Sequence, residues 1–255
     1  MLKKLQVKQT LFKSGETKIA VPLTAPTPPK KLLEEARKAV AAKPDVIEWR
    51  IDFYKNVLDQ QEYRNTQQQL IHILGKIPPL LTTFRTQHEG GVAPLSDEQY
   101  FKLMQWISLN QLTDLLDLEL NRDASQTIPI ISAAHRAGLK IIISNHEFQQ
   151  TPSEEEIITR LQQMATMHAD IAKIAVMPKN AADVLTLLNA TYHADQQISI
   201  PLITMAMGGQ LGKLSRISGS LFGSVLSFAS VGEASAPGQL TAATLRKALE
   251  MLSAK

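Results

Sequence analysis

A lysine in the middle of an apolar run is the sharpest chemical signal in the sequence. Lys173 lies within DIAKIAV, residues 170–176, a run that predicts a buried strand. Lysine is almost never fully buried without a partner or a task. Strand alternation places it on the same face as Ile171 and Ala175, where burial and neighbouring cations would favour the neutral amine that attacks carbonyl groups. The alternative is a lysine that reaches water or pairs with a carboxylate.

A histidine stands at the end of the preceding apolar run. His146 lies within SNHEF, residues 144–148. Adjacent strands of a barrel bring their ends within side-chain reach, so we expect His146 to meet Lys173. An imidazole moves protons near neutral pH when an acceptor orients its second nitrogen. The other interpretation is a loop histidine that faces solvent, which we prefer for the remaining five, His72, His88, His135, His168 and His193.

Arginines occur near the ends of three other predicted strands. Arg50 and Arg85 belong to the second and third strands, and Arg216 follows the seventh. Guanidinium groups bind carboxylates through paired hydrogen bonds, so three of them at one opening would hold an acidic ligand. For any one of these arginines taken alone, a surface ion pair is the preferred interpretation.

Carboxylates accompany these cations. By alternation Glu48 and Asp52 share a face with Arg50, and Glu89 follows Arg85 just before two glycines. Asp117 and Glu119 share a face of the fourth predicted strand, where we assign them the structural role of balancing the cations. No spacing typical of metal ligands, such as His-Glu-x-x-His, occurs in the sequence. We therefore predict neither a metal ion nor a cofactor.

Short runs rich in Ile, Val and Leu alternate with segments of helical period, the pattern of strands buried on both faces. Eight such alternations in one chain of this length favour a (β/α)8 (TIM) barrel. The predicted strands are Lys18 to Leu23, Asp45 to Ile51, Pro79 to Phe84, Leu115 to Leu120, Lys140 to Ser144, Asp170 to Val176, Ile200 to Met205, and Leu221 to Phe228. The predicted helices are Pro28 to Ala42, Asp59 to Leu74, Ser96 to Asn110, Ser125 to Ala137, Ser153 to His168, Asn180 to Ala194, a short one near Leu214, and Leu240 to Leu252.

The N-terminal segment precedes the first predicted strand. Residues Leu5 to Lys13 alternate enough to predict a hairpin that ends near Ser14 and covers the N-terminal mouth, the bottom, of the barrel. No linker or internal repeat divides the chain, so we expect residues 1–255 to form a single domain.

The composition excludes several kinds of function. The 255 residues include 44% apolar and 5% aromatic side chains, and the net charge of +3 is spread without a run of like charges. We therefore expect no nucleic-acid partner. There is no cysteine, which excludes disulfides and thiolate nucleophiles. Since the sequence has neither the apolar core of a secretion signal nor about 18 consecutive apolar residues, we expect a cytoplasmic protein with no membrane partner.

Taken together, the motifs resemble type I 3-dehydroquinate dehydratase (3-dehydroquinase) from Lys18 to Gln239. They occur in that family's order and at similar spacing. The matching segments are Glu48-x-Arg50-x-Asp52, Phe84-Arg85-Thr86 with Glu89-Gly90-Gly91, Ser144-Asn145-His146, Lys173-Ile174-Ala175, Ser215-Arg216, Phe222-Gly223-Ser224 and Ser235-Ala236-Pro237-Gly238-Gln239.

The resemblance implies dehydration of 3-dehydroquinate to 3-dehydroshikimate in the shikimate route to aromatic amino acids, by a cofactor-free homodimer. It implies that Lys173 forms the imine, His146 transfers protons, Glu89 orients His146 and Arg216 binds the substrate carboxylate. It further implies that the ring hydroxyls are held, and the site closed, by Glu48, Arg50, Arg85, Ser235 and Gln239. Residues 232–239, rich in small side chains, are predicted to form a lid.

Two other functions remain open at this point. Another class I aldolase or lyase that forms a Schiff base would use the same barrel and a similar lysine. A barrel without catalytic activity that binds an anionic metabolite would use the arginines alone. The His146–Glu89 pair favours dehydration over the first, and covalent trapping on Lys173 distinguishes the second.

Overall fold

The computed structural model describes residues 3–26, 29–232 and 238–253 of the chain. In this part of the chain, eight parallel strands follow one another in sequence order. Strands β3 to β9 pair successively, and the last strand, β10, pairs with β3. They are β3 (Lys18–Leu23), β4 (Val46–Arg50), β5 (Leu80–Thr83), β6 (Leu115–Glu119), β7 (Lys140–Glu147), β8 (Ile171–Val176), β9 (Leu202–Ala206) and β10 (Leu226–Ser230). The ring closes between β9 and β10, where the Val225 amide donates to the Leu202 carbonyl at 2.8 Å. The predicted (β/α)8 barrel is confirmed.

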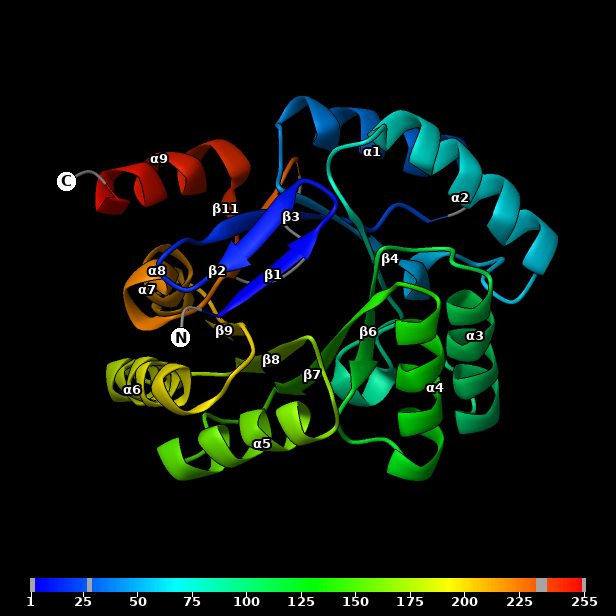
Figure 1. Ribbon diagram of the computed structural model, residues 1–255. Helices are drawn as coiled ribbons and strands as arrows, with labels where there is room; N and C mark the ends of the chain where they lie inside the picture. The colour runs from blue at the N-terminus through cyan, green and yellow to red at the C-terminus, as the bar shows by residue number, and fades with distance from the viewer. Residues whose placement is uncertain (1–2, 27–28, 233–237, 254–255) are drawn as a thin grey trace.

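Helices surround the strands on the outside (Figure 1). Those described are α1 (Pro29–Ala41), α2 (Gln60–Leu74), α3 (Asp97–Leu109), α4 (Ala124–Arg136), α5 (Glu154–Thr166), α6 (Ala181–Gln197), α7 (Leu211–Ile217), α8 (Gly219–Phe222) and α9 (Ala242–Ser253). Two short 3-10 helices, η1 (Ile51–Phe53) and η2 (Gln87–Glu89), follow β4 and β5, and the short β11 (Leu240–Thr241) pairs with β10. Helix α5 begins as its sequence predicts, because Ser153 accepts a hydrogen bond from the Glu156 amide at 3.2 Å.

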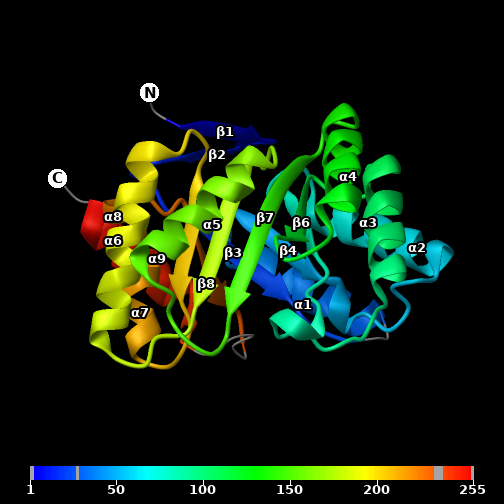
Figure 2. The same cartoon turned by 90° about the horizontal axis from the view of Figure 1, so that it is seen from below.

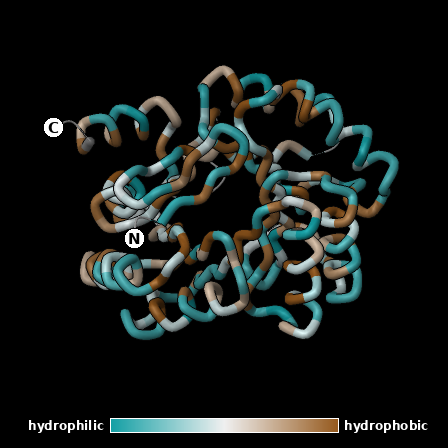
Figure 3. Tube along the Cα trace, viewed as in Figure 1, coloured by the Kyte–Doolittle hydropathy of each residue, from teal (hydrophilic) through white to brown (hydrophobic). Residues whose placement is uncertain are grey.

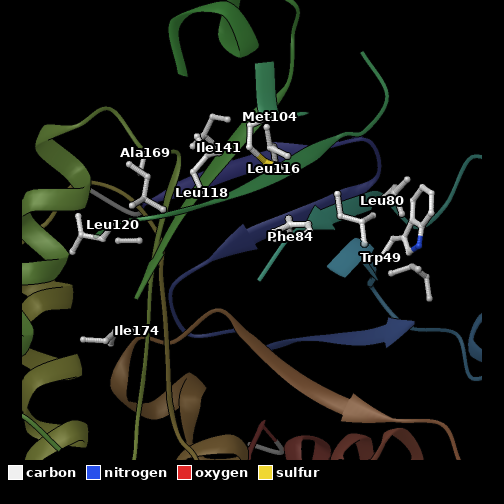
Figure 4. Packing of buried hydrophobic residues seen from close by; sticks show 14 of the residues in the cluster. Trp49, Leu80, Phe84, Met104, Leu116, Leu118, Leu120, Ile141, Ala169 and Ile174 are labelled. Carbon is white, nitrogen blue, oxygen red and sulfur yellow. The ribbon is translucent and has the colours of Figure 1, made fainter. Parts of the chain in front are cut away.

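Each strand contributes to two separate cores, since alternate side chains point to opposite faces. On β8, Ala172, Ile174 and Val176 pack outward against the helices, whereas Ile171 and Ala175 pack inside the barrel. Figure 4 shows the outer core, and in Figure 3 hydrophilic segments lie along the outer helices. Lys173 therefore lies on the inward face of its strand, as predicted.

An antiparallel hairpin, β1 (Lys4–Val7) with β2 (Thr10–Lys13), closes the bottom of the barrel. Val7 and Phe12 are buried in the inner core, at the N-terminal ends of the strands. In Figure 2 the hairpin lies at one end of the molecule and the arrows of β7 and β8 point to the other. The predicted hairpin is confirmed, and the C-terminal ends of the strands are left to form the site.

Two predicted strands differ from the structure by three or more residues at one end. The run Leu221 to Phe228 contains the end of helix α8, and the chain turns at Gly223, with φ +107°, before β10 begins at Leu226. Strand β7 is longer than predicted, because its pairing with β8 continues past Ser144 to Glu147. The second difference affects the site, since it places His146 within the sheet.

No helix in the described residues is long and apolar enough to cross a membrane.

Replacing Phe12 by alanine tests the role of the hairpin. Phe12 is fully buried, so the Phe12→Ala variant should lose about 3–5 kcal/mol of unfolding free energy, as large-to-small core substitutions do. Chemical denaturation measures this loss. The exposed neighbour Gln9, changed to alanine, is the matched control and should stay close to the parent protein. Equal stability of the two variants would contradict a hairpin that seals the core.

Candidate active site

A cavity of about 210 Å³ lies at the C-terminal ends of the strands, the end at which barrel enzymes carry their active sites. All but one of the site residues predicted from the sequence line it. They are Glu48, Arg50, Arg85, Glu89, His146, Lys173, Arg216 and Gln239. The exception, Ser235, lies outside the described residues, as does most of the predicted lid, residues 233–237.

Lys173 is the central group of the cavity. Its side chain extends from the middle of β8 and is only 3% exposed. The ammonium nitrogen Nζ lies 3.1 Å from Oδ2 of Asp117 and 4.9 Å from the centre of the Phe228 ring. The prediction of a neutral amine from the sequence took account only of the burial of Lys173 and of neighbouring cations. The structure adds the carboxylate of Asp117 as a hydrogen-bond partner of the amine.

Asp117 joins Lys173 to Arg85. Its Oδ1 accepts hydrogen bonds from Arg85 Nη2 at 2.8 Å and from the Ser144 hydroxyl at 2.7 Å, while Oδ2 accepts from Lys173. Burial opposes the negative charge of Asp117, but Arg85 and Lys173 outweigh it and lower the pKa of the carboxyl to about 2. Asp117 is therefore an ionised carboxylate with no exposed surface.

Arg85 is the hub of the buried charges. Its Nη1 donates to Glu119 at 3.1 Å, to Ser144 at 3.0 Å and to Glu89 at 3.3 Å. Burial opposes its charge, yet Asp117, Glu119 and Glu89 outweigh that effect and raise the pKa of Arg85. Asp117 and Glu119 thus balance the cations, as the sequence predicts.

His146 and Glu89 form a second pair of contacting polar groups in the cavity. Nδ1 of His146 lies 2.9 Å from Oε2 of Glu89, and the His146 amide donates to the same oxygen at 3.1 Å. Burial, followed by the charges of Arg85, Lys173 and Arg50, lowers the pKa of His146 well below its ordinary value. Burial raises the pKa of Glu89 to about 7, with the nearby Arg85 acting in the opposite direction. Once Glu89 is ionised, it holds the Nδ1 proton and leaves Nε2 free to accept one.

Two glycines allow the turn that carries Glu89. The residue after η2, Gly90, has φ +81°, a conformation that L side chains rarely adopt, and a Cβ there would lie 2.4 Å from the Phe148 ring. A Cβ on Gly91 would lie 1.8 Å from the carbonyl oxygen of Arg85. The glycine pair therefore lets the chain fold back against Arg85, which brings the Glu89 carboxylate within hydrogen-bond distance of His146.

Residues of β4 and its end form another wall. Arg50 donates from Nε and Nη2 to the two oxygens of Asp52, both at 2.8 Å, and Glu48 accepts from the Thr83 hydroxyl at 2.8 Å. Strand alternation does not explain the first pair, because β4 ends at Arg50 and Asp52 belongs to the 3-10 helix η1. The guanidinium of Arg50 is thus aligned at the edge of the cavity, with its side chain 15% exposed.

The opposite wall is apolar, apart from Arg216 of α7. Met205, Met207, Ala175 and Phe228 line it. Nη1 of Arg216 lies 3.5 Å from the Phe228 carbonyl oxygen, and burial lowers the pKa of Arg216 to about 10, so it remains a cation at neutral pH. The cavity therefore has polar groups on one side, apolar groups on the other and Lys173 between them.

Sequence reasoning missed two contributions to the site. It gave Asp117 a structural role and did not predict its contact with Lys173, and it did not identify the methionine wall. The signal for Asp117 was its acidic side chain on the inward face of a buried strand. Methionines in an apolar run carry no comparable signal. Among the described residues, no group of three or more His, Asp or Glu side chains is arranged to hold a metal ion.

Fold and site together define a (β/α)8-barrel protein with its reactive groups at the C-terminal mouth. Residues 19–255 match the model of the type I 3-dehydroquinase family. The chain is 47% identical to 3-dehydroquinate dehydratase of Enterococcus faecalis, with 98% of each chain covered, and 48% identical to that of Lactiplantibacillus plantarum, with 94% of each covered. A crystal structure of the type I enzyme from Clostridium difficile is 40% identical, with 99% of each chain covered and a TM-score of 0.94. The chain belongs to the type I 3-dehydroquinase family.

The ionisation of His146 can be measured by nitrogen-15 NMR on histidine-labelled protein, with His146→Ala as the assignment control. Because its pKa is lowered, we expect the ring to stay neutral at about pH 6.5, where an ordinary histidine is half protonated. Above pH about 7, where Glu89 is ionised, the proton should reside on Nδ1. A doubly protonated ring at pH 6.5, or a proton on Nε2 at pH 8, would contradict the assigned pair.

Proposed function

We propose that the protein removes water from 3-dehydroquinate to give 3-dehydroshikimate, through an imine on Lys173. The observation that carries the proposal is a buried lysine amine in one cavity with a carboxylate-bound imidazole. The curated relatives named 3-dehydroquinate dehydratase support the substrate. The Clostridium difficile relative, solved with covalently modified comenic acid, supports covalent chemistry.

The first stage joins substrate and lysine. The unprotonated amine of Lys173 adds to the ring ketone, and a carbon–nitrogen double bond forms. The carbonyl oxygen leaves as water, with one proton from the amine and the proton that the ammonium gave up before the attack. The nitrogen of this imine keeps one proton and one positive charge. It is then an electron sink that acidifies the hydrogens on the neighbouring carbon.

The second stage breaks the carbon–hydrogen and carbon–oxygen bonds. Nε2 of His146 takes the proton from the carbon next to the imine, and the electron pair moves into the resulting enamine. The enamine expels the β-hydroxyl, which leaves as water with the proton that His146 returns. A second water molecule cleaves the imine, which releases the product and restores Lys173. Glu89 holds the imidazole in the required orientation and stabilises its charge during the transfer.

The remaining wall residues suit an acidic, hydroxylated ring. We assign Arg216 to the substrate carboxylate, since a buried guanidinium offers a paired, charge-assisted contact. Glu48, Arg50 and Gln239 border the same space and are assigned to the ring hydroxyls. Arg85 borders the same space and is also assigned to the ring hydroxyls, and its contacts place Glu89 and Asp117. Ser235 remains a prediction from the resemblance.

The cellular setting follows from the same family. We assign the protein to the biosynthesis of aromatic amino acids. The homodimer, the single domain over residues 1–255 and the cytoplasmic location remain predictions, and sedimentation of the purified protein tests the first.

Trapping with borohydride tests the imine and the substrate together. With 3-dehydroquinate present, reduction should fix a stable mass increase on Lys173, located by peptide mass spectrometry. Lys173→Ala should abolish it. The matched control Lys140→Ala, at a lysine that pairs with Asp170 and begins strand β7, should retain it. A class I aldolase would not turn over this substrate, and an anion-binding barrel would give no adduct.

Replacing His146 by alanine tests the proton transfers. General acid–base catalysis contributes about 10²–10⁴-fold, so turnover should fall by that factor. Imine formation depends less on His146, and the covalent adduct should accumulate. His135→Ala, at a histidine paired with Asp170, is the control. Turnover equal to that of the parent protein would refute the role of His146.

A further inference from the structure

We propose that Asp117 is a catalytic residue, the counter-ion that keeps the imine nitrogen of Lys173 protonated during elimination. This inference rests on the proposed function, because the imine is its central intermediate. It gives a catalytic role to a carboxylate for which the sequence predicts only the structural role of balancing nearby cations.

The first support is the position of the carboxylate. Its Oδ2 lies 3.1 Å from Lys173 Nζ, the atom that becomes the imine nitrogen. Forming the imine replaces two of the three ammonium hydrogens by the double bond to carbon, and the protonated product keeps one N–H and one positive charge. The same oxygen can therefore accept from the nitrogen before and after the reaction, without movement of either strand.

The second support is the fixed geometry of Asp117. Arg85 and Ser144 hold its other oxygen at 2.8 and 2.7 Å, and no part of the side chain is exposed. A carboxylate held in this way cannot turn away when the ligand arrives, and water cannot replace it. Its charge acts at short range in a buried site, where electrostatic stabilisation is strongest.

The third support is that Arg85 has other partners. Glu119 and Glu89 also contact it, at 3.1 and 3.3 Å. Neutralising Arg85 therefore does not by itself explain why a third carboxylate is placed between Arg85 and Lys173. The apolar groups on the opposite wall, among them Phe228, cannot neutralise the charge of the imine.

A counter-ion has two opposite effects on the reaction. Its hydrogen bond with Lys173 Nζ, at 3.1 Å, must be given up or rearranged before the nitrogen attacks the ketone, which slows the first step. It also stabilises the protonated imine, which speeds transfer of a proton from the neighbouring carbon to His146. A residue that merely maintained the fold would slow both steps when changed, so the two effects together distinguish a counter-ion from a structural residue.

The experiment compares the Asp117→Asn variant with the parent protein. In the presence of 3-dehydroquinate, cyanoborohydride, which reduces protonated imines in preference to neutral ones, is used to titrate the intermediate. The reduction midpoint, the pH at which reduction of the imine is half-maximal, should fall by roughly 1–3 pH units without the carboxylate. The turnover number should fall about 10²–10³-fold. Formation of the imine at acidic pH should be as fast as in the parent protein or faster.

Asp114→Asn is the matched control. Asp114 lies three residues earlier and pairs with Lys8 at 2.8 Å, so it tests the loss of a lysine-paired carboxylate outside the cavity. Its reduction midpoint should equal that of the parent protein. If Asp117→Asn fails to fold, Raman spectra of the adduct that accumulates in His146→Ala provide an independent test. The carbon–nitrogen stretch should shift in heavy water at pH 8, as a protonated imine requires.

The outcomes separate the two proposals. If the parent protein forms no reducible adduct with 3-dehydroquinate, the proposed function fails. If the adduct forms, but the midpoint is unchanged in Asp117→Asn or the Raman band shows no shift in heavy water, the counter-ion assignment is overturned and the proposed function stands.

Discussion

The burial of Arg85 among carboxylates is the interaction on which the rest of the site depends. Breaking a buried ion pair by removing one partner costs about 3–5 kcal/mol, and Arg85 serves Asp117, Glu119 and Glu89 at once. Asp117 in turn holds Lys173, and Glu89 holds His146. The two reactive groups are therefore placed by one guanidinium through two separate carboxylates. The strands alone would fix only which face of the sheet Lys173 and His146 lie on, and their positions along the barrel axis.

Most of the fold could be predicted because the strands are buried on both faces. Their apolar runs mark them without any help from tertiary structure, and β3 from Lys18 to Leu23 agrees residue for residue. The larger errors arose where the hydrophobic pattern and the backbone hydrogen bonds indicate different strand ends. Leu221 and Phe222 are apolar but helical, and His146 is polar but paired with β8. Periodicity reports burial, while strand limits are set by backbone pairing.

The candidate site could be predicted as a set of residues but not as a set of contacts. Lys173 and His146 are conspicuous because polar groups interrupt apolar strands. The contact between Lys173 and Asp117 joins strands β8 and β6, which are not neighbours, because β7 lies between them. Alternation assigns each side chain to a face and says nothing about reach across the barrel. The pairing of Arg50 with Asp52 likewise depends on a 3-10 helix that the pattern does not reveal.

The asymmetry of the cavity suits the proposed role of Lys173, whose amine must be both held in place and able to react. On one side Asp117 stabilises positive charge at Nζ, and on the other Phe228, Met205 and Ala175 keep water from screening it. In the proposed reaction, the charge of the protonated imine is already balanced by Asp117. His146, kept neutral by burial and by the same cations, is the base to which the proposed reaction assigns removal of the neighbouring proton. In the proposed reaction the two requirements are met by separate carboxylates, since Asp117 serves the electron sink and Glu89 serves the base.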